Sequence, residues 1–294
     1  MKNKLLPLIA LIFALPQSSS GESAWRAGTL QNPELDELSG LVASHQYQGV
    51  YWGVNDSGNS PLIYALSAEG RDLGQVRIPN MTNRDPEALG YGNCAFAPKC
   101  IYIADIGDNR QHRREVRIEL IPEPSLKARQ INVAKTVFVT YPNGAINAEA
   151  MLVRPADSAI MIIEKVDRSS EAAARVFWIG PQTSRGRQTR VIARQVATVA
   201  TETSDGGQTG PFTDAAFRKN GTDFYLRDYR RVYRATGLLG RGEVVALMSI
   251  PSPAMMIGEA IAVSADGSRL VISSEGRHAP IATIALNNSR QGTN

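Results

Sequence analysis

The chain has 294 residues, of which 43% are hydrophobic and 20% are charged, a composition typical of soluble globular proteins. Its 32 basic and 28 acidic residues leave a formal net charge of +4, which is too small to hold nucleic acid by bulk charge. The length allows one domain of propeller or barrel size, or two smaller domains.

The N-terminus has the pattern of a secretory signal. Lys2 and Lys4 precede the apolar stretch LLPLIALIFAL, and small polar residues follow it. This stretch is too short to span a bilayer about 30 Å thick, although an uncleaved anchor is the alternative. We therefore predict a signal peptide over residues 1–21, one domain over residues 24–290, a periplasmic or secreted location and no membrane span after removal of the signal.

The two cysteines of the chain, Cys94 and Cys100, lie close together in NCAFAPKC. In an exported protein such a pair predicts a disulfide across a hairpin loop. The three histidines are scattered and add no paired spacing, so the sequence disfavours a zinc enzyme.

Five segments begin with an acidic residue, which a small or apolar residue and a strand-like run follow. The acids are spaced by 50, 62, 65 and 45 residues. They are Glu37, Glu87, Glu149, Asp214 and Glu259. Self-similarity at intervals of this length is typical of propellers and other repeat architectures.

Further strand-like runs follow in each segment, separated by turn residues. The second runs are rich in Tyr, Ile and Val, which suit a pleated surface. They are GVYWGVND (49–56), CIYIADIGDN (100–109), AIMIIEKVD (159–167), DFYLRDY (223–229) and RLVISSEG (269–276). The fifth segment lacks a fourth run, and the N-terminal stretch AWRAGTL (24–30) is left to supply it.

This pattern predicts an all-β fold, a five-bladed β-propeller closed by the N-terminal strand. A six-bladed propeller with one degenerate blade and a β-sandwich are the alternatives. The long intervals 87–149 and 149–214 leave room for extra strands.

Inner strands of a propeller surround its axis, so the opening acids would surround one end of the channel. The second strands return to the same mouth, and acids stand near their ends. These are Asp56, Asp105, Glu164, Asp228 and Glu275. The sequence therefore predicts two tiers of carboxylates at one mouth.

Two like charges about 6 Å apart repel by roughly 3 kcal/mol at an effective dielectric constant of about 20. Protonation, basic partners or a cation must relieve that repulsion. Oxygen ligands without nearby His or Cys favour Ca²⁺. We predict Ca²⁺ ligands at Glu37, Glu87, Glu149, Asp214 and Glu259. The alternative is a network of arginines and backbone amides that ties the blades together.

Basic residues near the same mouth favour an anionic ligand such as a phosphate ester, because guanidinium groups match its oxygens. The predicted ligand-binding residues are Arg84, Arg110, Lys165, Arg227, Glu164, Glu275 and Arg277. A solvated rim that pairs with its own acids is the alternative.

Several stretches resemble a group of exported bacterial β-propeller proteins, mostly uncharacterised and often labelled phytase-like or esterase-like. They are ELSGLV (37–42), GVYWGVNDSG (49–58), LIYALSAEG (62–70), RDPEALG (84–90) and IYIADIGDNR (101–110). The layout is also similar to that of the calcium-activated nucleotidases, which are five-bladed propellers with blade-start glutamates around a channel Ca²⁺. This similarity implies the same metal role for the five opening acids.

The sequence thus predicts an exported propeller that binds, and as one possibility hydrolyses, an anionic small molecule. In a hydrolase the metal would polarise the ester and Asp56, Asp105 or Asp228 would act as general base. A non-catalytic scaffold for a protein or glycan at the cell envelope is the alternative. A glycosidase is a third hypothesis, which the aromatic content of 6% disfavours. The expected partners are a small anionic ligand or an envelope protein, with the chain a monomer.

Overall fold

A computed structural model describes residues 25–286, apart from residues 168, 171, 220 and 237–242. The predicted signal peptide over residues 1–21 lies outside the described residues and stays a prediction. Every regular element in the described part of the chain is a β-strand, and no helix there is long and apolar enough to cross a membrane. The predicted all-β class is confirmed.

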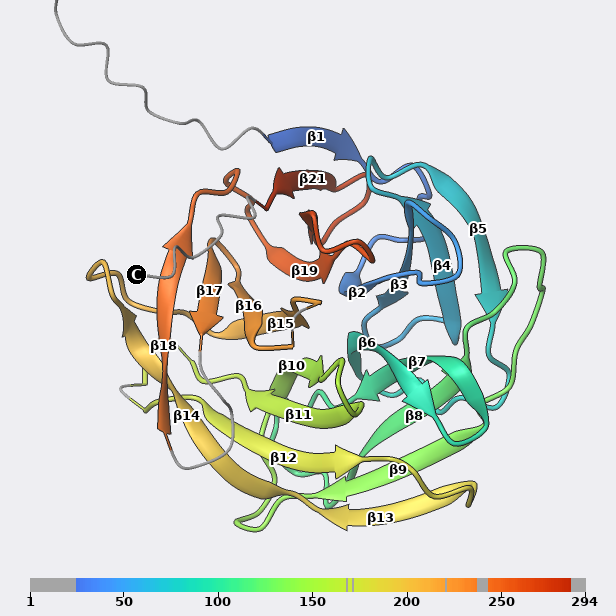
Figure 1. Ribbon diagram of the computed structural model, residues 1–294, viewed down its shortest axis with the longest axis horizontal. Coiled ribbons are helices and arrows are strands. Elements are labelled where there is room, and N and C mark those ends of the chain that lie inside the picture. The colour runs from blue at the N-terminus through green and yellow to red at the C-terminus, as the bar shows by residue number, and fades with distance from the viewer. Residues whose placement is uncertain (1–24, 168, 171, 220, 237–242, 287–294) are drawn as a thin grey trace, which may run out of the picture.

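The strands form sheets arranged around a central axis, as Figure 1 shows. The first sheet has the order β2-β3-β4-β5 and is antiparallel throughout. Its strands are β2 (Leu38–Ala43), β3 (Val50–Asn55), β4 (Leu62–Ser67) and β5 (Asp72–Arg77). The second sheet has the order β13-β9-β8-β7-β6. Its strands are β6 (Pro86–Cys94), β7 (Ala97–Asp105), β8 (Val116–Pro122), β9 (Lys135–Thr140) and β13 (Gln188–Ile192).

The third sheet has eight strands, in two antiparallel halves that join where β14 pairs in parallel with β18. One half contains β10 (Ala148–Val153), β11 (Ala159–Glu164), β12 (Arg175–Pro181) and β14 (Arg194–Thr203). The other half contains β15 (Phe212–Phe217), β16 (Asp223–Asp228), β17 (Val232–Thr236) and β18 (Glu243–Ile250).

The last sheet has the order β1-β21-β20-β19 and joins the two ends of the described chain. Its strands are β19 (Gly258–Val263), β20 (Arg269–Ser274), β21 (Pro280–Ala285) and β1 (Trp25–Thr29). Trp25 pairs with Ile284 and Thr29 with Pro280. The predicted closure by the N-terminal strand is confirmed.

One strand-like run, RVIARQVATV (190–199), is divided between two sheets. It contains a break at Ala193, and the residues before it lie in β13, which pairs in parallel with β9 of the preceding sheet. The residues after it belong to β14, which pairs with β12. A run of β-branched residues cannot show from sequence alone which neighbouring strand each part joins.

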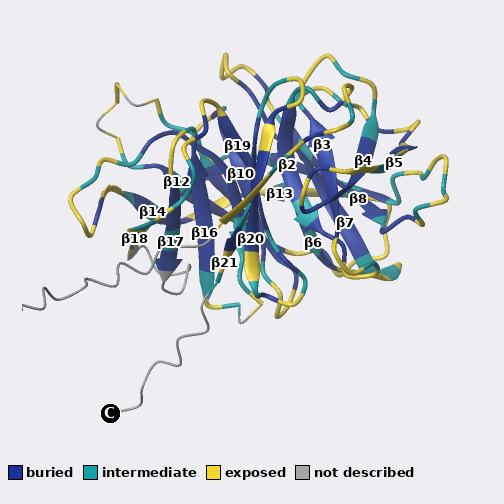
Figure 2. Ribbon diagram, turned by 90° about the horizontal axis from the view of Figure 1, so that it is seen from above, coloured by how far each residue is buried: buried dark blue, intermediate teal, exposed yellow. Residues whose placement is uncertain are grey.

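The inner strands β2, β6, β10, β15 and β19 lie next to one another around the axis, and β19 contacts β2 to complete the ring. Their close approach requires small side chains. A β-carbon added to Gly40 of β2 would fall 2.8 Å from the Cα of Ala88 on β6. Figure 2 shows the ring edge-on, with buried strands between exposed loops.

The core fills the spaces between neighbouring sheets with apolar side chains. Trp52 of β3 and Ile103 of β7 are fully buried in one such cluster, and Tyr102 and Ile160 in the next. Each buried large apolar side chain contributes about 1.5–3 kcal/mol to folding. This packing makes the ring a rigid frame for the side chains at its mouth.

The hairpin of β6 and β7 carries the one disulfide of the described chain, between Cys94 and Cys100, whose Cα atoms are 6.1 Å apart. The predicted hairpin disulfide is confirmed. It lies at the end of β6 away from Glu87, so it is not part of the acidic mouth.

Candidate metal centre

One cavity of about 180 Å³ gathers acidic side chains at the N-terminal ends of the inner strands. The acids in its lining are Glu37, Asp56, Glu87, Glu149, Glu259 and Glu275. Two of them, Asp56 and Glu275, directly follow the second strands β3 and β20. The structure thus brings four of the five opening acids and two of the five second-strand acids to one mouth, while their role as metal ligands stays a prediction.

A β-bulge at the start of each inner strand explains how the glutamates face the cavity. The pairing of β6 with β7 shifts between Pro86 and Ala88, which leaves Glu87 as the extra residue. Glu149 of β10 and Glu259 of β19 are extra residues in the same way. A bulge changes the direction of one side chain and interrupts the alternation of side chains between the two faces of the strand. The extra residue can therefore be polar without entering the apolar core.

The equivalent positions in β2 and β15 carry hydroxyls instead of carboxylates. The register shifts leave Ser39 and Thr213 as the extra residues. Ser39 Oγ donates to the Pro86 carbonyl oxygen at 2.8 Å, and Thr213 Oγ1 donates to the Gly258 carbonyl oxygen at 2.9 Å. Each hydroxyl therefore links its inner strand to the next one around the ring.

Two of the five predicted metal ligands, Glu37 and Asp214, therefore do not occupy the bulge position that the other three share. Glu37 precedes its bulge by two residues, and it still lines the cavity, where its Oε2 accepts a hydrogen bond from Asn59 Nδ2 at 2.5 Å. Asp214 follows its bulge and occupies the position that Gly40 and Ala88 hold in β2 and β6.

The structure does not bring Asp214 to the cavity lining. Its side chain is fully buried and accepts hydrogen bonds from the amides of Ala215 at 2.8 Å and Ile261 at 2.9 Å. Burial raises the pKa of the Asp214 carboxyl well above its usual range, against the effect of these amides. Asp214 thus belongs to the expected alternative, a network of backbone amides that ties neighbouring inner strands together.

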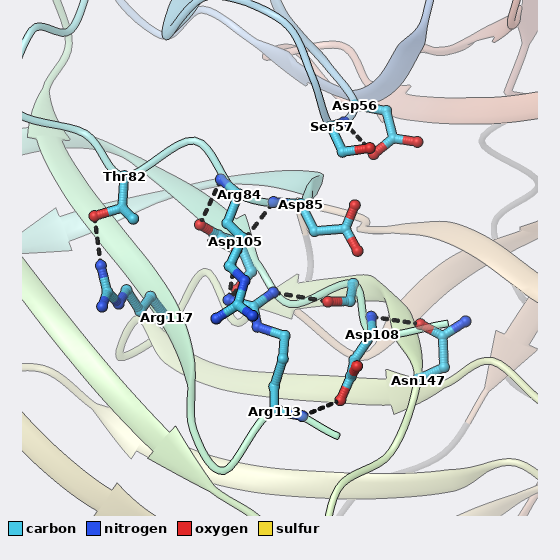
Figure 3. Close-up of polar contacts among 11 residues, drawn as sticks. Asp56, Ser57, Thr82, Arg84, Asp85, Asp105, Asp108, Arg113, Arg117 and Asn147 are labelled. Atoms are coloured by element: carbon cyan, nitrogen blue, oxygen red, sulfur yellow. Dashed lines mark hydrogen bonds and ion pairs between the residues drawn. The ribbon is translucent and has the colours of Figure 1, made fainter. Parts of the chain in front are cut away.

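The tightest group of carboxylates consists of Asp56, Asp85 and Glu87, each of which offers an oxygen within 4.8 Å of the others. Glu87 is only 4% exposed, and the other two are half-buried. Asp85 was missed in the sequence, where it stands before Pro86 in the same RDPEALG stretch as Glu87. Figure 3 shows the side chains of Asp56 and Asp85, and it shows the guanidinium group of Arg113 bound to Asp105 rather than to either of them.

The pKa values at this mouth rise because the carboxyls are buried and close to one another. Burial, then the charge of Asp56, raises the pKa of Asp85 to about 6. Burial and the neighbouring Glu149 raise the pKa of Glu87 well above its usual range and that of Glu259 to about 8. Ionising the whole group without a counter-charge therefore costs free energy.

Lys165 is the one lysine or arginine in the lining of this cavity as the structure describes it. Its Nζ donates to Glu149 and, at 2.7 Å, to the hydroxyl of Tyr229. Burial opposes the charged form of Lys165, but the carboxylate of Glu149 and the Tyr229 hydroxyl keep its pKa above the usual value. Burial raises the pKa of Glu149 to about 7 against the pull of this lysine.

Of the three candidate bases, Asp56 alone lines the cavity. Asp105 is buried and pairs with Arg113 Nη2 at 2.7 Å, and it accepts the amides of Arg84 and Asp85 (Figure 3). Asp228 is buried and accepts the amides of Arg230 and Arg231, both at 2.7 Å. These contacts give Asp105 and Asp228 structural roles at the turns that end β7 and β16.

Of the predicted ligand-binding residues, Lys165 and Glu275 line the cavity. Glu164 pairs with Arg175 instead, and Arg227 is buried against Met255 and below Gly258. The remaining three, Arg84, Arg110 and Arg277, are exposed and outside the lining. The sequence missed Tyr229 and Asn109, which do line the cavity.

Comparison with known proteins adds information on the fold alone. No family model matches the chain, and no curated protein matches its sequence. The PQQ-bound aldose sugar dehydrogenase of Streptomyces coelicolor is similar in structure, with a TM-score of 0.50 and 10% identity over 90% of this chain and 98% of that one. The fold is a β-propeller. A gluconolactonase of Xanthomonas campestris also matches, with a TM-score of 0.45 and 10% identity over 85% of this chain and 73% of that one.

Proposed function

We propose that the chain is a five-bladed propeller that binds Ca²⁺ at its acidic mouth and there binds and hydrolyses a small anionic molecule such as a phosphate ester. The count of five treats the eight-stranded sheet as two blades, because each half has its own inner strand, β10 or β15. The observation that carries the metal proposal is the approach of Asp56, Asp85 and Glu87 oxygens to within 4.8 Å of one another.

The residues present fit a hard divalent cation. All three donors are carboxylates, which Ca²⁺ prefers, and no His or Cys lies among them. The raised pKa values of Asp85 and Glu87 agree with a site where a bound cation would offset the cost of ionising buried, neighbouring carboxyls. Gly107 supports the fit, since a β-carbon there would fall within 2.4 Å of Asp85 Oδ2.

A bound Ca²⁺ would supply electron withdrawal from a phosphoryl oxygen of the substrate. Lys165, held by Glu149 and Tyr229, offers a positive charge to another anionic oxygen in the same cavity. Asp56 is half-buried in the lining, and with one carboxylate oxygen on the ion its other oxygen would accept the proton of an attacking water. The low aromatic content of the chain agrees with a charged substrate rather than a sugar.

The proposal includes kinship with the exported phytase-like or esterase-like propellers and a periplasmic or secreted location. Its support is the set of motifs between ELSGLV (37–42) and IYIADIGDNR (101–110) and the N-terminal signal pattern. The shared bulge position of Glu87, Glu149 and Glu259 is consistent with the resemblance to the calcium-activated nucleotidases, in which the blade-start glutamates surround a channel Ca²⁺.

A non-catalytic scaffold is the second candidate, and a specific observation favours it. Met256 and Ile257 precede β19 and are 91% and 42% exposed. The amide of Glu275, which lines the acidic cavity, donates to the Ile257 carbonyl at 2.9 Å. An apolar pair beside the mouth is suited to a protein partner rather than to a phosphate ester.

The test begins with the metal content of the purified protein and its melting temperature in calcium and in chelator. We expect calcium to raise the melting temperature of the wild type and not that of Glu87→Gln, while the exposed Glu34→Gln responds like the wild type. Hydrolysis of 4-nitrophenyl phosphate is then measured on the same proteins. A thermal shift without turnover on a panel of phosphate esters favours the scaffold, and the absence of any shift contradicts the metal proposal.

A further inference from the structure

A second cavity, of about 250 Å³, lies at the opposite end of the channel from the acidic mouth. Its lining includes the last residues of the inner strands, such as Ala43 of β2, Val153 of β10 and Val263 of β19. Glu87, Glu149 and Glu259 of the acidic cavity stand at the second residues of β6, β10 and β19. Glu149 and Val153 of β10 are four residues apart, so at about 3.3 Å per residue the lining residues of the two cavities lie roughly 13 Å apart along this strand.

This second cavity is chemically the reverse of the first. Leu41, Leu89 and Met151 contribute apolar surface, and none of the described lining residues is an aspartate or glutamate. Among the same described residues, Lys219 is the one lysine or arginine. A cavity of about 150 Å³ with apolar walls is enough to hold benzene, so this one accommodates an aromatic ligand of more than one ring.

Two stacked rings form a flat wall of the cavity. The rings of His45 and Tyr91 lie parallel, with centroids 3.8 Å apart and planes within 6°. Burial lowers the pKa of His45, and the charge of Glu123 does not reverse this, so the imidazole is neutral near pH 7. A neutral, flat wall, exposed at His45 and half-buried at Tyr91, favours an aromatic ring as its neighbour.

Lys219 marks where the polar end of such a ligand would lie. Its side chain is exposed at the rim, and no hydrogen bond or ion pair joins it to another described residue. The adjoining groove, which Lys219 also lines, carries two acids, Glu69 and Asp266, and one further described cation, Arg269. A short, singly charged anion therefore fits better than a longer or multiply charged one.

We propose that this cavity, which we call the apolar mouth, is a binding site for a small flat aromatic monocarboxylate. The ring lies between the His45–Tyr91 wall and the apolar strand ends, and the carboxylate reaches Lys219. The apolar mouth shares no described lining residue with the acidic cavity and needs no metal. This proposal is therefore independent of the proposed hydrolase function.

The experiment is isothermal titration calorimetry of the full chain with 2-naphthoate, in chelator and in calcium. The neutral analogue 2-naphthalenemethanol tests the charge. Lys219→Gln removes the positive charge at the rim, Tyr91→Leu removes the flat wall, and Lys127→Gln is the matched control because Lys127 is exposed and outside the cavity. Melting temperatures establish that each variant is folded.

We expect one 2-naphthoate per chain, with the same affinity in chelator and in calcium. Lys219→Gln should weaken 2-naphthoate binding about fivefold, as loss of a partly exposed ion pair does, and leave the neutral analogue unchanged. Tyr91→Leu should weaken both probes, and Lys127→Gln neither. Absence of saturable binding to the wild type, or equal affinities for Lys219→Gln and Lys127→Gln, overturns the proposal.

Discussion

Gly107 lies against the carboxylate of Glu87, so that a β-carbon on Gly107 would fall 2.3 Å from Glu87 Oε1. Gly107→Ala should therefore displace the carboxylates without removing one. We expect calcium affinity, measured by calorimetry, to fall by about tenfold or more, as for other losses of support around metal ligands.

Gly186→Ala is the matched control for that variant, because its nearest neighbouring atom would be 3.6 Å from the new β-carbon. If both glycine variants bind calcium like the wild type, the ion does not lie among Asp56, Asp85 and Glu87.

Glu87→Gln should stabilise the protein in chelator while it abolishes the calcium-dependent shift. Burial and neighbouring acids raise the pKa of Glu87, so its ionised form disfavours the folded state at neutral pH. A neutral isostere removes that cost, and we expect the melting temperature in chelator to rise by a few degrees. A lower melting temperature would mean that the Glu87 carboxylate stabilises the metal-free fold.

The metal-free protein should lose stability as the pH rises from about 4 to about 8. The folded-state pKa values of Asp85, Glu149 and Glu259 are about 6, 7 and 8, above the usual values of 3.8 and 4.5. The folded state therefore binds more protons than the unfolded state across this window, and each group costs stability once it ionises. Melting temperatures in chelator across this range measure the trend, which calcium should reduce. A stability that rises with pH in chelator would contradict these shifts.

The buried pair of Asp105 and Arg113 should act on folding rather than on chemistry. Asp105→Ala leaves Arg113 buried without its 2.7 Å partner, so the free energy of unfolding should fall by about 3 kcal/mol or more. Urea denaturation measures this loss. Loss of turnover in a variant of full stability would restore Asp105 as a candidate base.

Strand order and closure were accessible from the sequence because the turn residues and the β-rich runs recur in each segment. The run AWRAGTL was left over in the N-terminal segment while the fifth segment lacked a fourth strand, and in the structure it forms β1, which pairs with β21. The place of β13 was not accessible, since its β-branched residues suit a strand in either neighbouring sheet and do not specify parallel pairing with β9.

The candidate site was predicted in outline and missed in detail because the bulges shift the register by one residue. Counting acids aligned Asp214 with Glu87, whereas the structure aligns Thr213 with Glu87. Asp85 was overlooked because it stands before β6, and the bend at Arg84 and Asp85 brings its carboxylate beside that of Asp56. Such contacts between segments are set by tertiary structure and leave no periodic signal.

The most direct measurement of the central claim is anomalous diffraction from a crystal grown with calcium, recorded at long wavelength. The account predicts one anomalous peak at the acidic mouth, about 2.3–2.6 Å from carboxylate oxygens of Asp56, Asp85 and Glu87. No peak at saturating calcium, or a peak bound to other residues, would contradict it.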